Sequence, residues 1–407
     1  MKLLSVLESR KKTTLSDKVF ILGMYLLFFS GGISNLKVGT SGISITQLGG
    51  KPFLYEIAAL FIVLSLFIYL LGSKKIVLSK EKKIVLSLMF LSHFPIFLIH
   101  ILFSDNIIFG YFGSGQLRLM LLLSILSLTT ILYPVSKEIL KHAFIAIVTI
   151  GLVNGIYAIL AHLQFVDLMY VSSPRIPGFD RHSGLLSVPA SLGVLSGLNV
   201  VIGYWLYNDK KMKIGALIVV IGAIGLFLSI SFTGILMILI AICFLLLREM
   251  RKSLFLSSVV SLLIFGFILM IFLNYNLILS QNIKRIESIG GSFKVWYESY
   301  TFGVPWGELN NYTYGFEMIF PHNWLLAFLV HGGTVAFIFL LGLYIFYFKR
   351  IYSIIQSNKK NIENIDMIHI IIFFMLISAL FEQIFLLTPT VFILYLFIGF
   401  SVHSKKT

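Results

Sequence analysis

Apolar runs of about 20 residues recur along this chain, with short polar segments between them. The runs are continuously apolar and do not alternate as membrane-spanning strands do. An α-helix of this length crosses the hydrocarbon core of a bilayer. Only 12% of the residues are charged, whereas a typical soluble domain carries about 25%. The sequence therefore predicts an all-α polytopic membrane protein.

We expect about twelve transmembrane helices in a single integral membrane domain of residues 1–407. The predicted spans cover residues 19–34, 53–72, 84–103, 116–133, 143–163, 184–207, 214–230, 234–247, 253–273, 323–348, 366–387 and 390–402. A long polar stretch of residues 274–322 separates the ninth predicted span from the tenth and predicts a large loop.

The basic residues set the predicted orientation of these spans. The chain carries 32 Lys and Arg against 17 Asp and Glu, and most of the basic residues form short clusters between apolar runs. Positive charge favours the cytoplasmic side of a membrane, which predicts cytoplasmic termini and an extracytoplasmic loop 274–322. No basic stripe with stacking aromatics lies on a soluble segment, so we expect no nucleic-acid partner.

Eight basic residues fall on segments that this topology places outside. They are Lys37, Lys51, Arg118, Arg175, Arg181, Lys284, Arg285 and Lys294. Guanidinium groups donate paired hydrogen bonds to phosphate oxygens and keep their charge. We therefore predict that Arg175, Arg181 and Arg285 bind a diphosphate, with Arg118 and Lys294 as further candidates. The alternative is that these side chains are solvated or extend toward lipid headgroups.

His322 opens the tenth predicted span, directly after Pro321. An imidazole titrates near neutral pH and suits a general base for a sugar hydroxyl, so His322 is our candidate catalytic residue. Its neighbour Asn323 is a candidate substrate-binding residue. The alternative for this pair is a helix cap.

Two further residues are candidates for substrate contact. Glu382 lies within an apolar run, where an acidic side chain is costly and so indicates a function. Trp306 lies in the aromatic part of the long loop, where rings either anchor the loop at the membrane interface or stack on sugars. Cys243 is the only cysteine, and no acidic or histidine metal motif is present, so we expect neither a metal nor a cofactor.

The segment P-H-N-W-L-L-A-F-L-V-H-G-G at 321–333 is similar to a signature of the O-antigen polymerase and O-antigen ligase superfamily of bacterial membrane glycosyltransferases. The stretch 296–307, with Gly303 and Gly307, resembles that family's Gly-x-Gly-like turn. The loop 175–184 resembles its arginine-and-glycine segment. The chain departs from the family pattern at Phe232-Thr233, where Ser-Arg-Gly is common.

The resemblance implies polymerisation of undecaprenyl-diphosphate-linked repeat units on the outer face of the bacterial cytoplasmic (inner) membrane. The product would be the O-antigen of lipopolysaccharide, a capsule or an exopolysaccharide. His322 would take the acceptor proton, and the arginines would stabilise the departing diphosphate. The expected partners are the lipid-linked donor and acceptor glycans and the bilayer. A chain-length regulator and a flippase of the same pathway are further candidates.

Two alternatives remain from the sequence. A ligase of the same superfamily would move finished polymer to another acceptor, and no residue separates it from a polymerase. A transporter or flippase for lipid-linked oligosaccharides would carry charges at the midplane of many helices, whereas here, apart from Glu382, they gather outside. The lack of an evident internal repeat also disfavours a transporter.

Overall fold

The computed structural model describes residues 13–32, 37–38, 43–44, 54–72, 76, 78–103, 113–167, 172–176, 179–186, 188–231, 233–234, 239, 275–305, 313–314, 317–318, 323–357, 362–380 and 390–403. For residues 37–38, 43–44, 113–118, 172–176, 179, 275–286, 313–314 and 317–318 only the backbone is described.

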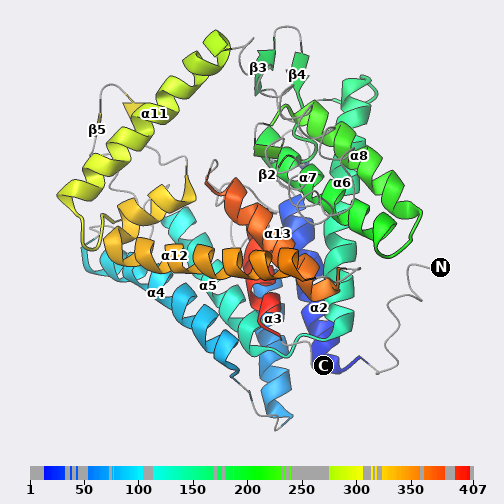
Figure 1. The fold of residues 1–407 in the computed structure, drawn as a ribbon, viewed down its shortest axis with the longest axis horizontal. Helices are drawn as coiled ribbons and strands as arrows, with labels where there is room; N and C mark the ends of the chain where they lie inside the picture. The colour runs from blue at the N-terminus through cyan, green and yellow to red at the C-terminus, as the bar shows by residue number, and fades with distance from the viewer. Residues whose placement is uncertain are drawn as a thin grey trace.

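The described residues form a helical bundle with three short antiparallel hairpins (Figure 1). The helices are α2 Leu15–Gly32, α3 Leu54–Leu71, α4 Lys80–Phe103, α5 Gly113–Leu132, α6 Lys137–His162, α7 Pro189–Asn208, α8 Ile214–Ser229, α11 Tyr275–Glu298, α12 Trp324–Gln356, α13 Asn364–Ser378 and α14 Thr390–Ser401. The hairpins pair β1 Lys37–Val38 with β2 Ile43–Ser44, β3 Ser172–Ile176 with β4 Phe179–Arg181, and β5 Thr313–Tyr314 with β6 Glu317–Met318.

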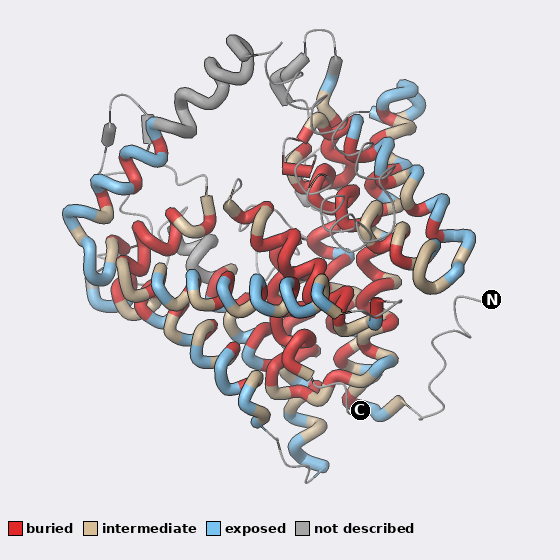
Figure 2. The backbone as a smooth tube through the Cα atoms, viewed as in Figure 1, coloured by how far each residue is buried: buried red, intermediate tan, exposed pale blue. Residues whose placement is uncertain are grey.

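Six of the described helices are long and apolar enough to cross a membrane, namely α2, α3, α4, α6, α7 and α12. Four shorter apolar helices cover residues 119–132, 214–229, 364–378 and 390–401. Large apolar side chains such as Leu60, Phe67 and Phe90 are exposed on the outer faces of these helices (Figure 2). Exposed apolar stripes on long helices fit a lipid surrounding, so the predicted class of helical membrane protein is confirmed.

The twelve-span topology remains a prediction. The predicted spans 234–247 and 253–273 lie outside the described residues, apart from two short fragments. The first half of the predicted loop 274–322 forms a helix, α11, of 24 residues.

Several described helices begin or end away from the predicted span boundaries, and local chemistry explains two of these differences. The sixth span begins at Pro189 and not at Gly184, because Gly184 adopts a left-handed φ of 64° that ends regular structure there. Proline then occupies the first helical turn, where its missing N–H costs nothing. The first span begins earlier than predicted because Thr14 caps it, accepting a hydrogen bond from the Asp17 amide at 3.2 Å.

The last helix forms the centre of the bundle. All twelve residues of α14 are buried, and an apolar helix that is buried all round belongs in a core. Gly399 lets α14 approach α5 closely, since a Cβ there would overlap the Thr130 side chain. The helix carries the red end of the colour scale in Figure 1.

The helix ends that the charge pattern assigns to the cytoplasm come together in the structure. The Tyr133 hydroxyl donates to Asp17 Oδ1 at 2.7 Å, and Arg350 forms an ion pair with Glu81. Close by, Trp205 Nε1 donates to the Ile362 carbonyl at 3.1 Å. These contacts connect the starts of α2, α4 and α13 to the ends of α5, α7 and α12. Each contact joins one helix start to one helix end that the charge pattern assigns to the same side, and the orientation of the bundle in the membrane stays a prediction.

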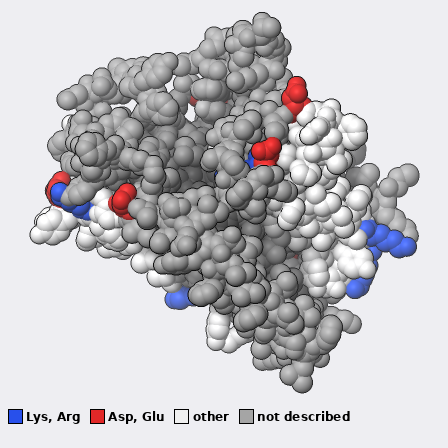
Figure 3. All heavy atoms as spheres, turned by 90° about the horizontal axis from the view of Figure 1, so that it is seen from above, with Lys and Arg blue, Asp and Glu red and all other residues white. Residues whose placement is uncertain are grey.

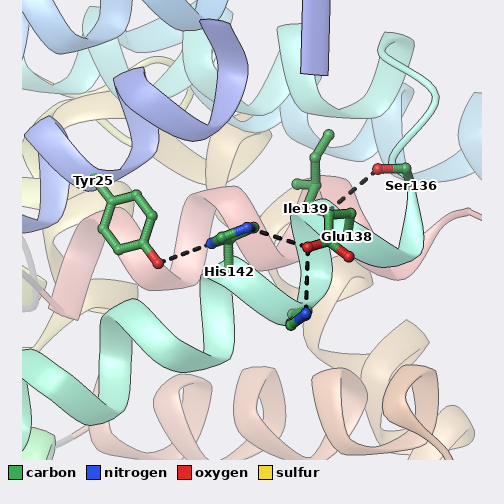
Figure 4. A network of polar contacts seen from close by, with 6 residues as sticks. Tyr25, Ser136, Glu138, Ile139 and His142 are labelled. Carbon is green, nitrogen blue, oxygen red and sulfur yellow. Dashed lines mark hydrogen bonds and ion pairs between the residues drawn. The ribbon is translucent and has the colours of Figure 1, made fainter. Parts of the chain in front are cut away.

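A polar network fixes the start of α6 against α2 (Figure 4). The Ser136 side chain caps α6 by accepting from the Ile139 amide at 3.3 Å. Glu138 Oε1 lies 3.4 Å from Lys141 Nζ and 3.3 Å from His142 Nε2. The other ring nitrogen of His142 lies 3.0 Å from the Tyr25 hydroxyl of α2. Lys141 is buried, so the carboxylate beside it offsets the cost of burying the ammonium.

Candidate functional site

Helix α12 is broken at Gly333. This residue has φ 62° and ψ −164°, a backbone conformation that residues with a Cβ rarely adopt. Figure 1 shows a short first part of α12 and a long second part that meet at a sharp angle. A break of this kind interrupts the helical hydrogen-bond ladder and leaves backbone donors and acceptors without helical partners. These groups must find other partners inside the protein.

The segment of residues 299–305, which we name the 299–305 turn, provides those partners. The Thr334 amide donates to the Tyr300 carbonyl at 2.8 Å, and the Thr334 hydroxyl donates to the same oxygen at 2.6 Å. In the opposite direction, the Val304 amide donates to the Val330 carbonyl at 2.8 Å. The turn therefore replaces intrahelical bonds on both sides of the break.

Two glycines make this close approach possible. Gly303 has a left-handed φ of 80°, and a Cβ on it would overlap the Val330 carbonyl oxygen. A Cβ on Gly333 would overlap the Thr301 carbonyl oxygen. The two sequence motifs that end in glycine, at 296–307 and 321–333, thus form one structural unit. Gly307 lies outside the described residues.

Side chains around the break hold α11 in place. Trp296 Nε1 donates to the Thr334 hydroxyl at 3.0 Å, and His331 Nδ1 lies 3.2 Å from the Val304 carbonyl. Val295, Val304 and Val330 form a small buried apolar cluster beside them. His331 is buried at the break, so its first role here is to fasten the turn to α12.

A cleft of about 320 Å³ opens beside the 299–305 turn. It is lined by Ile99 of α4 and by Glu298, Ser299, Tyr300, Thr301, Phe302, Gly303 and Pro305. One carboxylate and three hydroxyls, those of Ser299, Tyr300 and Thr301, can exchange hydrogen bonds with a polyhydroxylated ligand. The exposed rings of Tyr300 and Phe302 add apolar surface for the C–H faces of such a ligand. The cleft is therefore chemically suited to part of a sugar.

Asn323 caps the first part of α12. Its Oδ1 accepts from the Leu325 amide at 2.8 Å and from the Leu326 amide at 3.3 Å. Its Nδ2 donates to the Leu380 carbonyl, just beyond α13, at 2.6 Å. Both polar atoms of the side chain are thus engaged within the protein, which agrees with the capping alternative. Contact of Asn323 with substrate stays a prediction.

The β3–β4 hairpin carries two of the predicted phosphate ligands. Arg175 lies in β3, and Arg181 ends β4 in register with Ser172. Arg181 is half-buried, and its Nε donates to the Ser229 carbonyl at 3.4 Å. The next amide, of His182, donates to the Leu228 carbonyl at 3.0 Å. Two tips that the topology places on the outer side, the loop after α6 and the end of α8, therefore meet.

The other predicted site residues are described in part or lie outside the described residues. His322, Trp306 and Glu382 lie outside. Arg118 lies in α5 and Arg285 lies in α11, and for both residues only the backbone is described. Lys294 is exposed on α11. The structure thus places Arg175 and Arg181 on one hairpin and leaves their convergence with His322 a prediction.

A pair of histidines beside the hairpin was not anticipated as a unit. His162 Nδ1 at the end of α6 lies 3.3 Å from His182 Nε2. Burial lowers the pKa of the His182 imidazole, the charge of His162 lowers it further, and Asp180 raises it. Only the fold brings these residues together, because they are separated by the loop that forms the hairpin.

On the face shown in Figure 3, the described charged residues form a few small, separate groups and no continuous patch. In the described part of the chain, no group of three or more His, Cys, Asp or Glu side chains could hold a metal ion. No family model and no curated protein matches the chain in comparisons with known proteins.

Substitution of either glycine at the break tests this unit. We expect Gly333→Ala and Gly303→Ala each to lower the free energy of unfolding by about 2–4 kcal/mol, because the new Cβ meets backbone oxygen and the φ becomes strained. Thermal unfolding of the purified protein in detergent measures the loss. Gly290→Ala is the matched control, since a Cβ there meets nothing within 4 Å. A loss of the same size in the control would contradict the assignment.

The histidine pair predicts a pH dependence. The folded pKa of His182 is below its ordinary value of 6.5, so folding favours the neutral ring. This contribution to stability is complete above pH 6.5 and is lost as the pH falls from 6.5 toward the folded pKa. We expect His182→Gln to flatten the acid side of the unfolding-midpoint curve between about pH 8 and about pH 5. Parallel curves for wild type and variant would exclude His182 as the source.

Proposed function

We propose that this protein is a membrane glycosyltransferase that polymerises undecaprenyl-diphosphate-linked oligosaccharide repeat units. The product is O-antigen, capsule or exopolysaccharide, made on the outer face of the bacterial cytoplasmic membrane. One observation carries the proposal most directly. The two motifs that resemble the polymerase and ligase superfamily meet at the break in α12, where Gly303 and Gly333 pack against each other's segments.

The proposed reaction is a displacement at the anomeric carbon of the donor glycan. His322 takes the proton of the acceptor hydroxyl, whose oxygen forms the new bond to the anomeric carbon. The bond from that carbon to the diphosphate oxygen breaks, and the electron pair leaves with the lipid diphosphate. Arg175, Arg181 and Arg285 stabilise the charge that develops on the leaving group.

The geometry near His322 supports this role through the backbone. His322 directly precedes Asn323, whose side chain caps α12 and binds the Leu380 carbonyl. The Trp324 amide also donates to the Ala379 carbonyl at 2.9 Å. A general base needs a fixed position relative to the hydroxyl it deprotonates. The cap fixes the start of α12, which directly follows His322 in the sequence.

The hairpin supports the role proposed for the arginines. Arg181 is oriented by its hydrogen bond to the Ser229 carbonyl, and the β3–β4 pairing keeps Arg175 on the adjacent strand. Two arginines on the paired strands of one hairpin can donate to the same diphosphate. The donor diphosphate then lies at this hairpin and the acceptor near the start of α12.

Removal of the proposed base tests the chemistry. In a deletion strain complemented with His322→Ala, we expect glycans of a single repeat unit, because the acceptor hydroxyl keeps its proton. Gel separation of the surface polysaccharide measures chain length, and immunoblotting of the membrane fraction verifies insertion. His142→Gln, at the opposite end of the bundle, is the matched control. Normal chain lengths in His322→Ala would remove the general-base role.

The deletion strain also separates the alternatives. Full-length polymer that stays on its lipid carrier would identify a ligase. Repeat units that accumulate on the cytoplasmic side would identify a transporter.

Arginine variants test the diphosphate site. We expect Arg175→Ala combined with Arg181→Ala to reduce polymer yield by roughly 100-fold or more, since each lost charge-assisted contact costs about 1.5–3 kcal/mol. Arg181→Lys should restore little, because lysine lacks both the Nε donor and the planar fork. Polymer yield is measured as above, with Lys137→Ala as an exposed, distant control. Full activity of the double variant would show that both arginines have only a structural role in the hairpin.

A further inference from the structure

The described half of α11 has three distinct faces. Ser288, Ser292 and Val295 are buried on the side that packs against α12. Ile289, Phe293 and Tyr297 follow at a spacing of four residues and are exposed. Four residues make slightly more than one helical turn, so these three side chains form one stripe.

The third face of this half-helix is polar. Glu287, Lys294 and Glu298 are exposed, and at 3.6 residues per turn they lie about a third of a turn away from the apolar stripe. Figure 2 shows the resulting alternation of exposed and buried residues along this part of α11. A helix that faces only water has no need for a separate apolar stripe beside its packed face.

The apolar stripe continues beyond the helix. Tyr300 and Phe302 in the 299–305 turn are also exposed, and Tyr297 is 78% exposed. We name Ile289, Phe293, Tyr297, Tyr300 and Phe302 the aromatic stripe. The stripe consists of four rings and one isoleucine, and within the described residues all five side chains are exposed.

The position of the stripe indicates what covers it. The 299–305 turn shares its cleft with Ile99 of α4, and α4 is one of the helices able to cross a membrane. Ile101 and Leu102, one turn further along α4, are 58% and 61% exposed. The aromatic stripe therefore lies level with the end of a membrane-spanning helix and continues its lipid-facing surface.

That level is the interface between hydrocarbon and lipid headgroups. Tyrosine and tryptophan gather in this layer, because a ring sits in the apolar part and its polar group reaches water. Basic side chains beside it extend toward lipid phosphates. Lys294 lies on the polar face of the same helix segment. An interfacial helix has this arrangement of one apolar and one charged face.

We propose that residues 289–302 are embedded in the headgroup layer of the bilayer, with the aromatic stripe toward the acyl chains and the polar face toward water. The bilayer thus covers a surface that the protein leaves exposed. The cleft beside the turn then opens at the depth of the lipid headgroups. The proposal stands independently of glycosyl transfer.

Site-directed spin labelling of the full chain in phosphatidylglycerol–phosphatidylethanolamine vesicles tests this placement. Cys243→Ser removes the only native thiol, and Phe293→Cys or Tyr297→Cys carries the nitroxide on the stripe. Glu287→Cys and Lys294→Cys are matched controls on the polar face of the same helix. Collision with lipid-soluble oxygen and with a water-soluble nickel chelate gives the accessibility of each position.

We expect the oxygen-to-nickel accessibility ratio at positions 293 and 297 to exceed the ratio at 287 and 294 several-fold. Equal ratios at all four positions would overturn the proposal and leave the stripe as a water-exposed platform for a soluble ligand. Low accessibility to both probes at 293 and 297, increasing on dilution, would also overturn it in favour of a second protein copy. Unfolding midpoints of the labelled variants verify that each remains folded.

Discussion

The architecture around α12 depends on the backbone hydrogen bonds between the 299–305 turn and the break at Gly333. The first part of α12 is mostly buried, and an unpaired buried amide or carbonyl costs about 1–3 kcal/mol. A buried helix can break only where other protein groups replace the backbone hydrogen bonds that it loses. Tyr300 and Val304 do so for Thr334 and Val330. Everything attached to the turn, including α11 and the cleft, takes its position from this exchange.

The same exchange explains how distant motifs form one site. The turn and the broken helix are separated in sequence by residues 306–323, yet each supplies what the other lacks. The turn provides acceptors and donors, and the break provides the space that a Cβ would fill. The Asn323 cap then sets the start of α12. The proposed chemistry is therefore built on backbone contacts as much as on reactive side chains.

Much of the fold was predictable from sequence, because the length of an apolar run is a local property. The helix α3 corresponds closely to a predicted span, and α2, α4 and α6 each overlap one but begin four to six residues earlier. The start of α7 differs from the predicted boundary because single residues, Gly184 and Pro189, determine where the helix begins. Helix α11 was missed because the long loop was judged by its polar and aromatic composition. The four-residue spacing of Ile289, Phe293 and Tyr297 carried the helical signal.

The site was predictable only in part. The motif at 321–333 and Gly303 were singled out from sequence. Their contact forms only in the folded protein, so the spacing of residues along the chain could not predict it. Asn323 caps amides within α12, which could be expected, but its third partner, the Leu380 carbonyl, lies beyond α13 and could not be predicted. The His162–His182 pair likewise depends on how the β3–β4 hairpin folds back. Local patterns identified the residues, and the fold determined their neighbours.

The first part of α12, residues 324–332, is held at both ends, by the Asn323 cap and by the 299–305 turn. It is therefore a helical segment of fixed length between two fixed contacts. Adding or removing one residue would rotate one contact against the other by about 100° and shift it by about 1.5 Å along the axis. Side chains along this segment can therefore change more freely than the number of residues in it. The register of this segment, and not its composition, keeps the Asn323 cap aligned with the break at Gly333.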